Sequence, residues 1–288
     1  MRKPTKAIIT DAGYASRYLP IAKTIPKGML PIGNRPIMQL VVEECVAADI
    51  KEIIIVATPE GKPIYEDYFN NAVNHIRKQL RAQGKDKRYD VVRKVLDFPK
   101  IRIIIQDPAL PYGNGSPIVS ARDYIADDEA FIVIYSDDVV FGTSDAHDLC
   151  EAFEKHPDAK AIIMGQEVTP DVVDKYGIIS LKNGKHLDNI VEKPAIGQAP
   201  SNLASYGRYL LTPEVFDYLK PNMTSLDDEL WTVDAITKMA ARGDVYVVKT
   251  KGQWMTTGDP KNYFLAHLKY VIDHEDYGQD IRDEITRL

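Results

Sequence analysis

The chain has 288 residues, of which 44% are hydrophobic and 27% are charged, a composition typical of a globular protein that buries a full core. Its formal net charge of −6 argues against a general nucleic-acid binder, so cations that bind phosphate must be concentrated locally. No stretch is apolar over the length that a bilayer span requires, and Cys45 and Cys150 lack the spacing of a metal site. We therefore expect a cytoplasmic protein with reduced thiols and no nucleic-acid or membrane partner.

A segment rich in proline and in small and basic residues follows the first predicted strand. The apolar run 7–10 is typical of a buried strand, and the segment 11–31 begins where that strand ends. Open α/β sheets bind ligands at the carboxyl ends of their strands, and Gly13 lets backbone N–H groups approach an anion there. Arg17, Lys23 and Lys27 add cations, and prolines at 20, 26 and 31 stiffen the segment. The pattern fits a rigid phosphate-binding loop, and locally it fits a solvated connector equally well.

Helical and strand patterns alternate along the rest of the chain. Helical spacing covers 35–48, and short apolar runs at 53–57, 101–105, 131–135 and 161–166 predict strands. A polar, basic helical excursion occupies about 62–96; its interspersed acids and lack of aromatic interleaving favour a solvated surface over a nucleic-acid site. The tail at about 262–288 is helical. We predict one α/β domain over 1–288, with a Rossmann-like mixed, mostly parallel sheet and helices on both faces.

Two of the predicted strands deliver polar residues to their carboxyl ends. The strand at 131–135 runs into Asp137 and Asp138, and adjacent carboxylates there are costly unless water or a metal ion neutralises them. Asp137 is therefore a candidate Mg²⁺ ligand, and a pair of turn aspartates is the alternative. The strand at 101–105 leads through Gln106 to Gly113 and Gly115, a glycine pattern that by itself indicates only a turn.

The opening segment resembles the sugar-1-phosphate nucleotidyltransferase family. The stretches 13–20 and 26–31, with Lys23 between them, follow the pattern G-x-G-T-R-x-L-P-x-T-K-x-x-P-K-E-M-L-P of its bacterial UTP–glucose-1-phosphate uridylyltransferase branch. Ala15 stands where that pattern has its second glycine, and Gly28 stands where it has glutamate. Further matches at 175–179, 189–194 and 199–211 extend the resemblance over nearly the whole chain.

The resemblance assigns several residues to ligands. It implies that Arg17 and Lys27 neutralise a triphosphate, that Asp137 holds Mg²⁺, and that Lys193 binds the phosphate of the sugar. It also implies nucleotide contacts for Ala12, Gly13, Gln106 and Gly115, with uracil facing the last two, and sugar contacts for Gly177 and Glu192.

The implied reaction joins UTP and glucose 1-phosphate to give UDP-glucose and pyrophosphate, in an enzyme that is a dimer or tetramer. One departure weakens this reading: Thr256 stands where the family has a second metal-binding aspartate, and a neutral hydroxyl is a much poorer Mg²⁺ ligand than a carboxylate. The alternatives are a non-catalytic sugar-nucleotide-binding paralogue, or a nucleotidyltransferase that uses dTTP or another sugar 1-phosphate.

Overall fold

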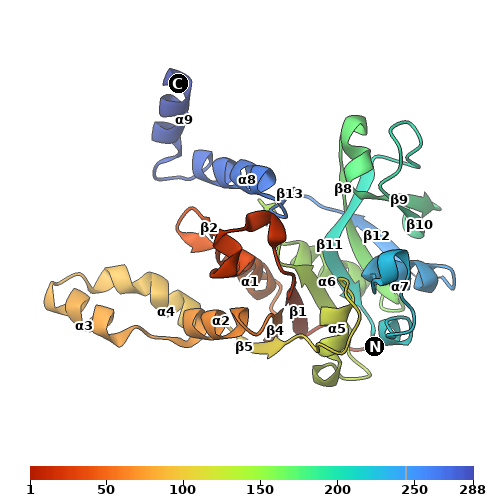
Figure 1. Cartoon of the computed structure of the whole chain (residues 1–288), viewed down its shortest axis with the longest axis horizontal. Coiled ribbons are helices and arrows are strands. Elements are labelled where there is room, and N and C mark those ends of the chain that lie inside the picture. The colour runs from red at the N-terminus through yellow and green to blue at the C-terminus, as the bar shows by residue number, and fades with distance from the viewer. Residues whose placement is uncertain (244) are drawn as a thin grey trace.

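A nine-stranded mixed sheet organises the protein (Figure 1). The computed structural model describes residues 1–243 and 245–288, with Leu226 described by its backbone alone. The strand order is β5-β4-β1-β6-β11-β8-β12-β10-β9. The bounds are β1 (Lys6–Asp11), β4 (Glu52–Ala57), β5 (Lys100–Ile105), β6 (Phe131–Tyr135), β8 (Ala161–Glu167), β9 (Gly177–Lys182), β10 (His186–Glu192), β11 (Leu203–Leu211) and β12 (Val245–Lys249). The predicted fold class is confirmed.

Parallel pairing is concentrated in the half of the sheet that comes first in the chain. Strand β1 runs parallel to both β4 and β6, with Thr10 opposite Val56 and Tyr135, and β4 runs parallel to β5. Strand β11 lies antiparallel between β6 and β8, so the other half of the sheet is mixed. The carboxyl ends of β1, β4, β5 and β6 consequently meet at one edge, which is where the predicted loops begin.

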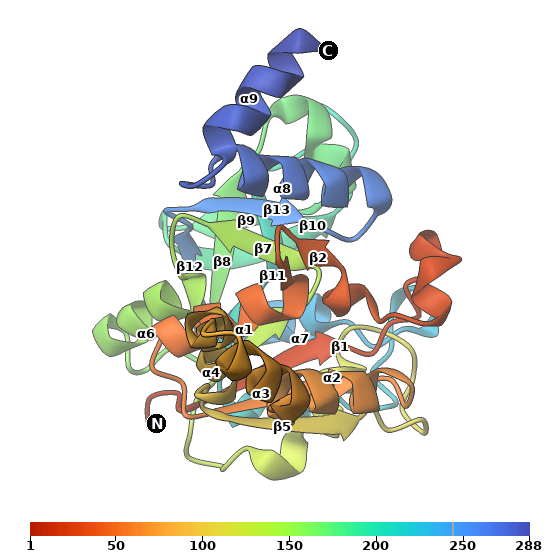
Figure 2. The same cartoon turned by 90° about the vertical axis from the view of Figure 1, so that its left-hand side faces the viewer.

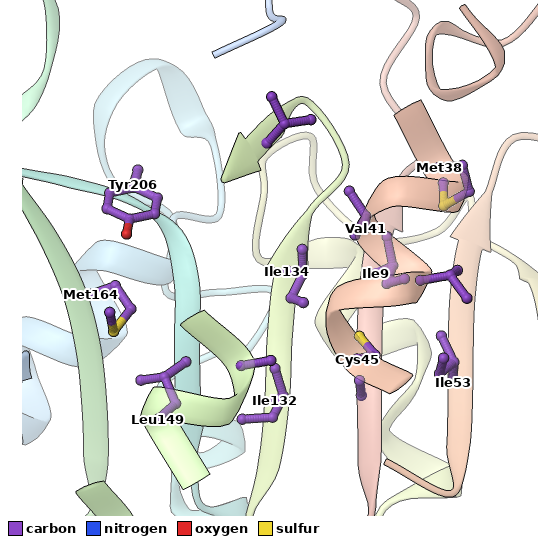
Figure 3. Close-up of a cluster of buried hydrophobic side chains, with 14 of the residues drawn as sticks. Ile9, Met38, Val41, Cys45, Ile53, Ile132, Ile134, Leu149, Met164 and Tyr206 are labelled. Carbon is purple, nitrogen blue, oxygen red and sulfur yellow. The ribbon is translucent and has the colours of Figure 1, made fainter. Parts of the chain in front are cut away.

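Helices cover both faces of the sheet because its strands are apolar on both sides. Ala7 and Ile9 belong to one buried cluster and Ile8 to the other, as the alternation of side chains along a strand requires. Helices α1 (Ile37–Ala47) and α6 (Asp145–Lys155) pack on the first face, where Figure 3 shows Cys45 among the core side chains. Helices α5 (Ser116–Ser120) and α7 (Thr232–Ala240) pack on the second. Cys45 and Cys150 are both free thiols, the first buried and the second half-buried.

Two helical segments extend from this body. Helices α2 (Gly61–Asn70), α3 (Asn74–Ala82) and α4 (Asp90–Leu96) follow β4, and α3 has no buried residue. Figures 1 and 2 show α3 and α4 projecting as an arm, and α9 (Gly278–Arg287) leading the C-terminus away beyond α8 (Pro260–Ile272). Among the described residues, no helix combines the length and apolarity needed to cross a bilayer.

Two small two-stranded sheets lie near the edge that carries the loops. Strand β2 (Pro31–Ile32) pairs with β3 (Arg35–Pro36), which closes the proline-rich segment. Strand β7 (Asp138–Phe141) pairs antiparallel with β13 (Gln253–Thr256) and places Thr256 opposite Asp138. A segment near residue 256 is thereby fixed beside the end of β6, although more than a hundred residues separate the two in sequence.

We predict that Ser144→Ala weakens the packing of α6 on α1. The Ser144 hydroxyl accepts the backbone N–H of His147 at 3.1 Å, and it donates to the carbonyl of Glu44 at 2.9 Å. Loss of a helix cap of this kind should lower the free energy of unfolding by about 1 kcal/mol, measured by urea denaturation. Thr286→Ala, which removes an exposed hydroxyl in α9, is the control, and equal stability of the two variants would contradict the prediction.

Candidate active site

A cleft of about 480 Å³ opens at the carboxyl end of β6 and is also lined by residues of β10 and β11. Arg17, Asp137, Gly177 and Glu192, all predicted from the sequence, line it. A neighbouring pocket of about 280 Å³ is lined by Asp11, Gly13 and Lys27 together with Pro26 and small residues of the opening segment. The structure therefore brings most of the predicted residues to two adjoining hollows at one edge of the sheet.

An ion pair between Lys27 and Asp137 joins the two hollows. The Lys27 ammonium donates to Asp137 Oδ2 at 2.7 Å, and the lysine side chain is only 17% exposed. Burial opposes ionisation of Asp137, yet the nearby Lys27 charge keeps the pKa of that carboxyl below its ordinary value. A fixed cation and an ionised carboxylate are therefore held side by side, an arrangement suited to a polyanion that carries its own metal ion.

The loop after β13 braces the backbone of Asp137. The backbone N–H and the hydroxyl of Thr257 both donate to the carbonyl of Asp137, at 2.5 and 2.9 Å, and Thr256 Oγ1 lies 3.5 Å from the same oxygen. A side-chain carbon added at Gly258 would lie 3.4 Å from Asp137 Oδ2. The segment in which the family carries its second aspartate thus lies against Asp137, and in this chain it offers hydroxyl groups there.

Asp138 has a supporting position. Its two carboxylate oxygens accept the indole N–H of Trp254 at 2.7 Å and the backbone N–H of Gly207 at 3.2 Å. Burial, followed by the charge of Asp137, raises the pKa of Asp138 to about 6. Because both of its oxygens are already bonded within the protein, Asp138 ties β7 to β11 and β13.

A buried ion pair holds the peptide groups around Asp137 from behind. Arg208 is 0% exposed; its Nε and Nη2 atoms donate to the Glu44 carboxylate at 3.0 and 2.9 Å. The same guanidinium donates to the carbonyl of Asp138 at 2.6 Å and to that of Tyr135 at 3.2 Å. These two carbonyls lie on either side of Asp137, so α1 and β11 together fix the turn that presents the Asp137 carboxylate.

The side of the cleft that carries Gly177 and Glu192 also contains a lysine that was not predicted from the sequence. Glu192 Oε2 would lie 2.9 Å from a side-chain carbon added at Gly177, so these two predicted residues are neighbours. Lys193 has a positive φ of 46°, and its backbone N–H donates to Tyr176. Lys175 lines the cleft, whereas Lys193 is not among the described lining residues. The sequence did contain a signal for Lys175, which directly precedes the predicted tyrosine-glycine turn.

The loops that follow β1 and β5 carry the residues that were predicted to bind the nucleotide. Ala12 follows the end of β1, and Gln106, which follows β5, donates its backbone N–H to Ala57 at 3.1 Å. Gly115 is buried: its N–H donates to the carbonyl of Leu230 at 2.8 Å, and an added side-chain carbon would lie 2.9 Å from that oxygen. Its glycine identity is thereby explained by packing, and its contact with a base stays a prediction.

Two exposed tyrosines connect these loops. Tyr14 and Tyr112 have parallel rings whose centroids lie 6.4 Å apart with an interplanar angle of 1°. Each lies next to a glycine of its loop, Tyr14 after Gly13 and Tyr112 before Gly113, and the glycine pattern alone did not single it out. The pair forms an aromatic contact between the two loops.

The chain matches a known protein family over most of its length. The model of the family described as nucleotidyl transferase matches residues 6–272. The chain therefore belongs to the nucleotidyl transferase family.

Several relatives of the chain share the name of one enzyme of that family. The chain is 36% identical to UTP–glucose-1-phosphate uridylyltransferase 2 of Staphylococcus saprophyticus, over 100% of this chain and 99% of the relative. It is 34% identical to the UTP–glucose-1-phosphate uridylyltransferase of Bacillus subtilis, over 99% and 96%. The fold superimposes on that of a UTP-bound UGPase from Acinetobacter baumannii with a TM-score of 0.86 at 28% identity, covering 100% of both chains.

We predict that Glu44→Gln destabilises the protein strongly, because it leaves the Arg208 guanidinium buried without a counter-charge. Removal of one partner of a buried pair costs about 3 to 5 kcal/mol, which urea denaturation would measure as a lower free energy of unfolding. The double variant Glu44→Leu/Arg208→Met removes both charges and should recover part of the loss. Lys249→Ala, which breaks the exposed pair with Glu167, is the control with a much smaller effect. A double variant no more stable than Glu44→Gln would contradict the prediction.

Proposed function

We propose that the chain is a UTP–glucose-1-phosphate uridylyltransferase, which transfers a uridylyl group from UTP to glucose 1-phosphate and releases pyrophosphate. Likeness over the full chain to enzymes of that name supports the choice of substrates. The geometric observation that carries the proposal is the contact of Lys27 with Asp137 at 2.7 Å, where the two hollows join.

The proposed reaction needs positioning and cations more than a protein nucleophile. A phosphate oxygen of glucose 1-phosphate attacks the α-phosphorus of UTP in line, and negative charge accumulates on the α-phosphoryl oxygens and the departing pyrophosphate. Lys27 and Arg17 oppose this charge from the opening segment, one largely buried and the other exposed at the mouth of the cleft. The Glu192 carboxylate, beside Gly177, accepts hydrogen bonds from sugar hydroxyls.

The second substrate requires a cation on the sugar side. Lys193, assigned by the family pattern, and Lys175, which lines the cleft, both come from the segments that frame Glu192. A compact ammonium on either side chain provides a point charge for the phosphate of the sugar. We assign Lys193 to this phosphate by the motif, with Lys175 as the nearby second cation.

The donor atoms at Asp137 suit a hard divalent cation such as Mg²⁺. An ionised carboxylate and the hydroxyl of Thr256 supply oxygen, the element that Mg²⁺ prefers, and the cleft leaves room for phosphate oxygens. We assign Asp137 as the protein ligand. When bound, Mg²⁺ would neutralise charge on the nucleotide phosphates.

We also propose that the enzyme is a cytoplasmic homo-oligomer. An apolar groove of about 790 Å³, with Leu19 61% and Phe264 66% exposed, supports burial against another copy. The free thiols support a reducing compartment. Light scattering of the purified protein would measure the oligomeric state, and a monomeric mass would contradict that part of the proposal.

The decisive experiment is pyrophosphate release from each of four nucleoside triphosphates with several sugar 1-phosphates. UTP with glucose 1-phosphate should give the highest kcat/KM. Preference for dTTP or another sugar would redirect the assignment within the family. Binding of UDP-glucose without any release of pyrophosphate would favour the non-catalytic alternative.

We predict that Thr256→Asp lowers the Mg²⁺ concentration that gives half-maximal rate, because a second anionic oxygen would face the ion beside Asp137. Asp137→Ala should nearly abolish activity in the natural protein and be partly tolerated in the Thr256→Asp background, since both side chains would then serve one ion. Rate against Mg²⁺ is measured for all four proteins. Effects that simply add on a logarithmic scale would show that residue 256 does not face the metal.

A further inference from the structure

Gly28 lies in a space that other side chains already fill. A side-chain carbon added there would lie 2.5 Å from the Tyr65 hydroxyl and 3.2 Å from both Asp11 Oδ2 and Met38 Cε. Backbone conformation does not require glycine, because Gly28 is absent from the described residues with positive φ. The glycine is therefore explained by what surrounds it, and a carboxylate oxygen is part of those surroundings.

That carboxylate belongs to Asp11, the last residue of β1. Asp11 is 9% exposed; its Oδ1 accepts the hydroxyl of Ser136 at 2.6 Å, and its Oδ2 accepts the hydroxyl of Tyr65 from α2. Ser136 immediately precedes Asp137, and Lys27 immediately precedes Gly28. Asp11 thus accepts a hydrogen bond from the residue before Asp137, and its other oxygen borders the space where a side chain at position 28 would lie.

The charges around Lys27 agree with this placement. Burial favours the neutral amine, but the carboxylates of Asp137 and then Asp11 outweigh it and raise the pKa of Lys27. The largely buried Lys27 ammonium therefore lies near two carboxylates, those of Asp137 and Asp11.

We infer that Asp11 is a positioning residue for Lys27, and that it supplies from β1 the carboxylate that the P-K-E-M-L-P pattern carries at position 28. Asp11 holds the end of β6 and the start of the 27–29 turn at a fixed separation through Ser136 and Tyr65. The inference rests on the proposed role of Lys27 with the nucleotide. It also explains the difference from the pattern at position 28, because Gly28 leaves the space in which Asp11 and Tyr65 meet.

A mutant cycle tests this relocation of the carboxylate. The four proteins are the natural chain, Asp11→Ala, Gly28→Glu and the double variant, each assayed for kcat and for KM of both substrates, and by calorimetry for UTP affinity. Asp11→Ala should lower kcat/KM for UTP at least tenfold and leave KM for glucose 1-phosphate within threefold. Gly28→Glu should also lower it, because two carboxylates then compete for one space. The double variant should recover at least half of the loss on a logarithmic scale.

Controls separate this inference from folding and from the proposed function. Repeating the cycle in a Tyr65→Phe background removes the hydroxyl that crowds residue 28, and circular dichroism reports folding of every variant. Asp123→Ala removes an exposed carboxylate and should behave as the natural chain.

The two proposals can fail separately. If the natural chain releases no pyrophosphate, the proposed function is overturned. Calorimetry of the same four proteins, with whichever nucleoside triphosphate binds, would still decide the role of Asp11. Normal behaviour of Asp11→Ala, or a double variant no better than the product of the single effects in both backgrounds, would overturn the inference.

Discussion

The enclosed guanidinium of Arg208 is the constraint on which the geometry of the site depends. It donates to the carboxylate of Glu44 in α1, to carbonyls at both ends of the Asp137 turn, and to the carbonyl of Gly207. A buried cation without access to water is stable only while these acceptors surround it. Helix α1, strand β11 and the turn at Asp137 must therefore be assembled together. The ion pair therefore couples correct folding of the core to correct presentation of Asp137.

The fold was largely predictable because its strands are continuous apolar runs. Residues 7–10, 53–57, 101–105 and 131–135 all lie within observed strands, and the parallel register of the first three pairings brings their loops to one edge. The predicted mostly parallel pairing describes that half of the sheet. Strand β11 enters antiparallel between β6 and β8, an order that depends on long-range pairing and has no local pattern.

The sequence predicted the site residues that directly follow a strand. It did not predict contacts between residues that lie far apart in the chain. Asp137 and Lys27 were found by their local context, but their direct contact spans 110 residues. Glu44 and Arg208 are separated by 164 residues and look like ordinary helix and strand positions. Asp11 was overlooked because it ends a strand as many turn aspartates do, and only the packing around Gly28 reveals what its carboxylate contacts.

The contact between Lys27 and Asp137 has a consequence for which anions the site prefers. An incoming phosphate that lacks a counter-ion must draw Lys27 from a carboxylate that is then left without its partner in a largely buried setting. A triphosphate that arrives with a divalent cation replaces both partners of the pair. Its phosphate oxygens bind the Lys27 ammonium, and its cation binds the Asp137 carboxylate. Binding then becomes an exchange of partners, which favours the metal–nucleotide complex over bare inorganic phosphate.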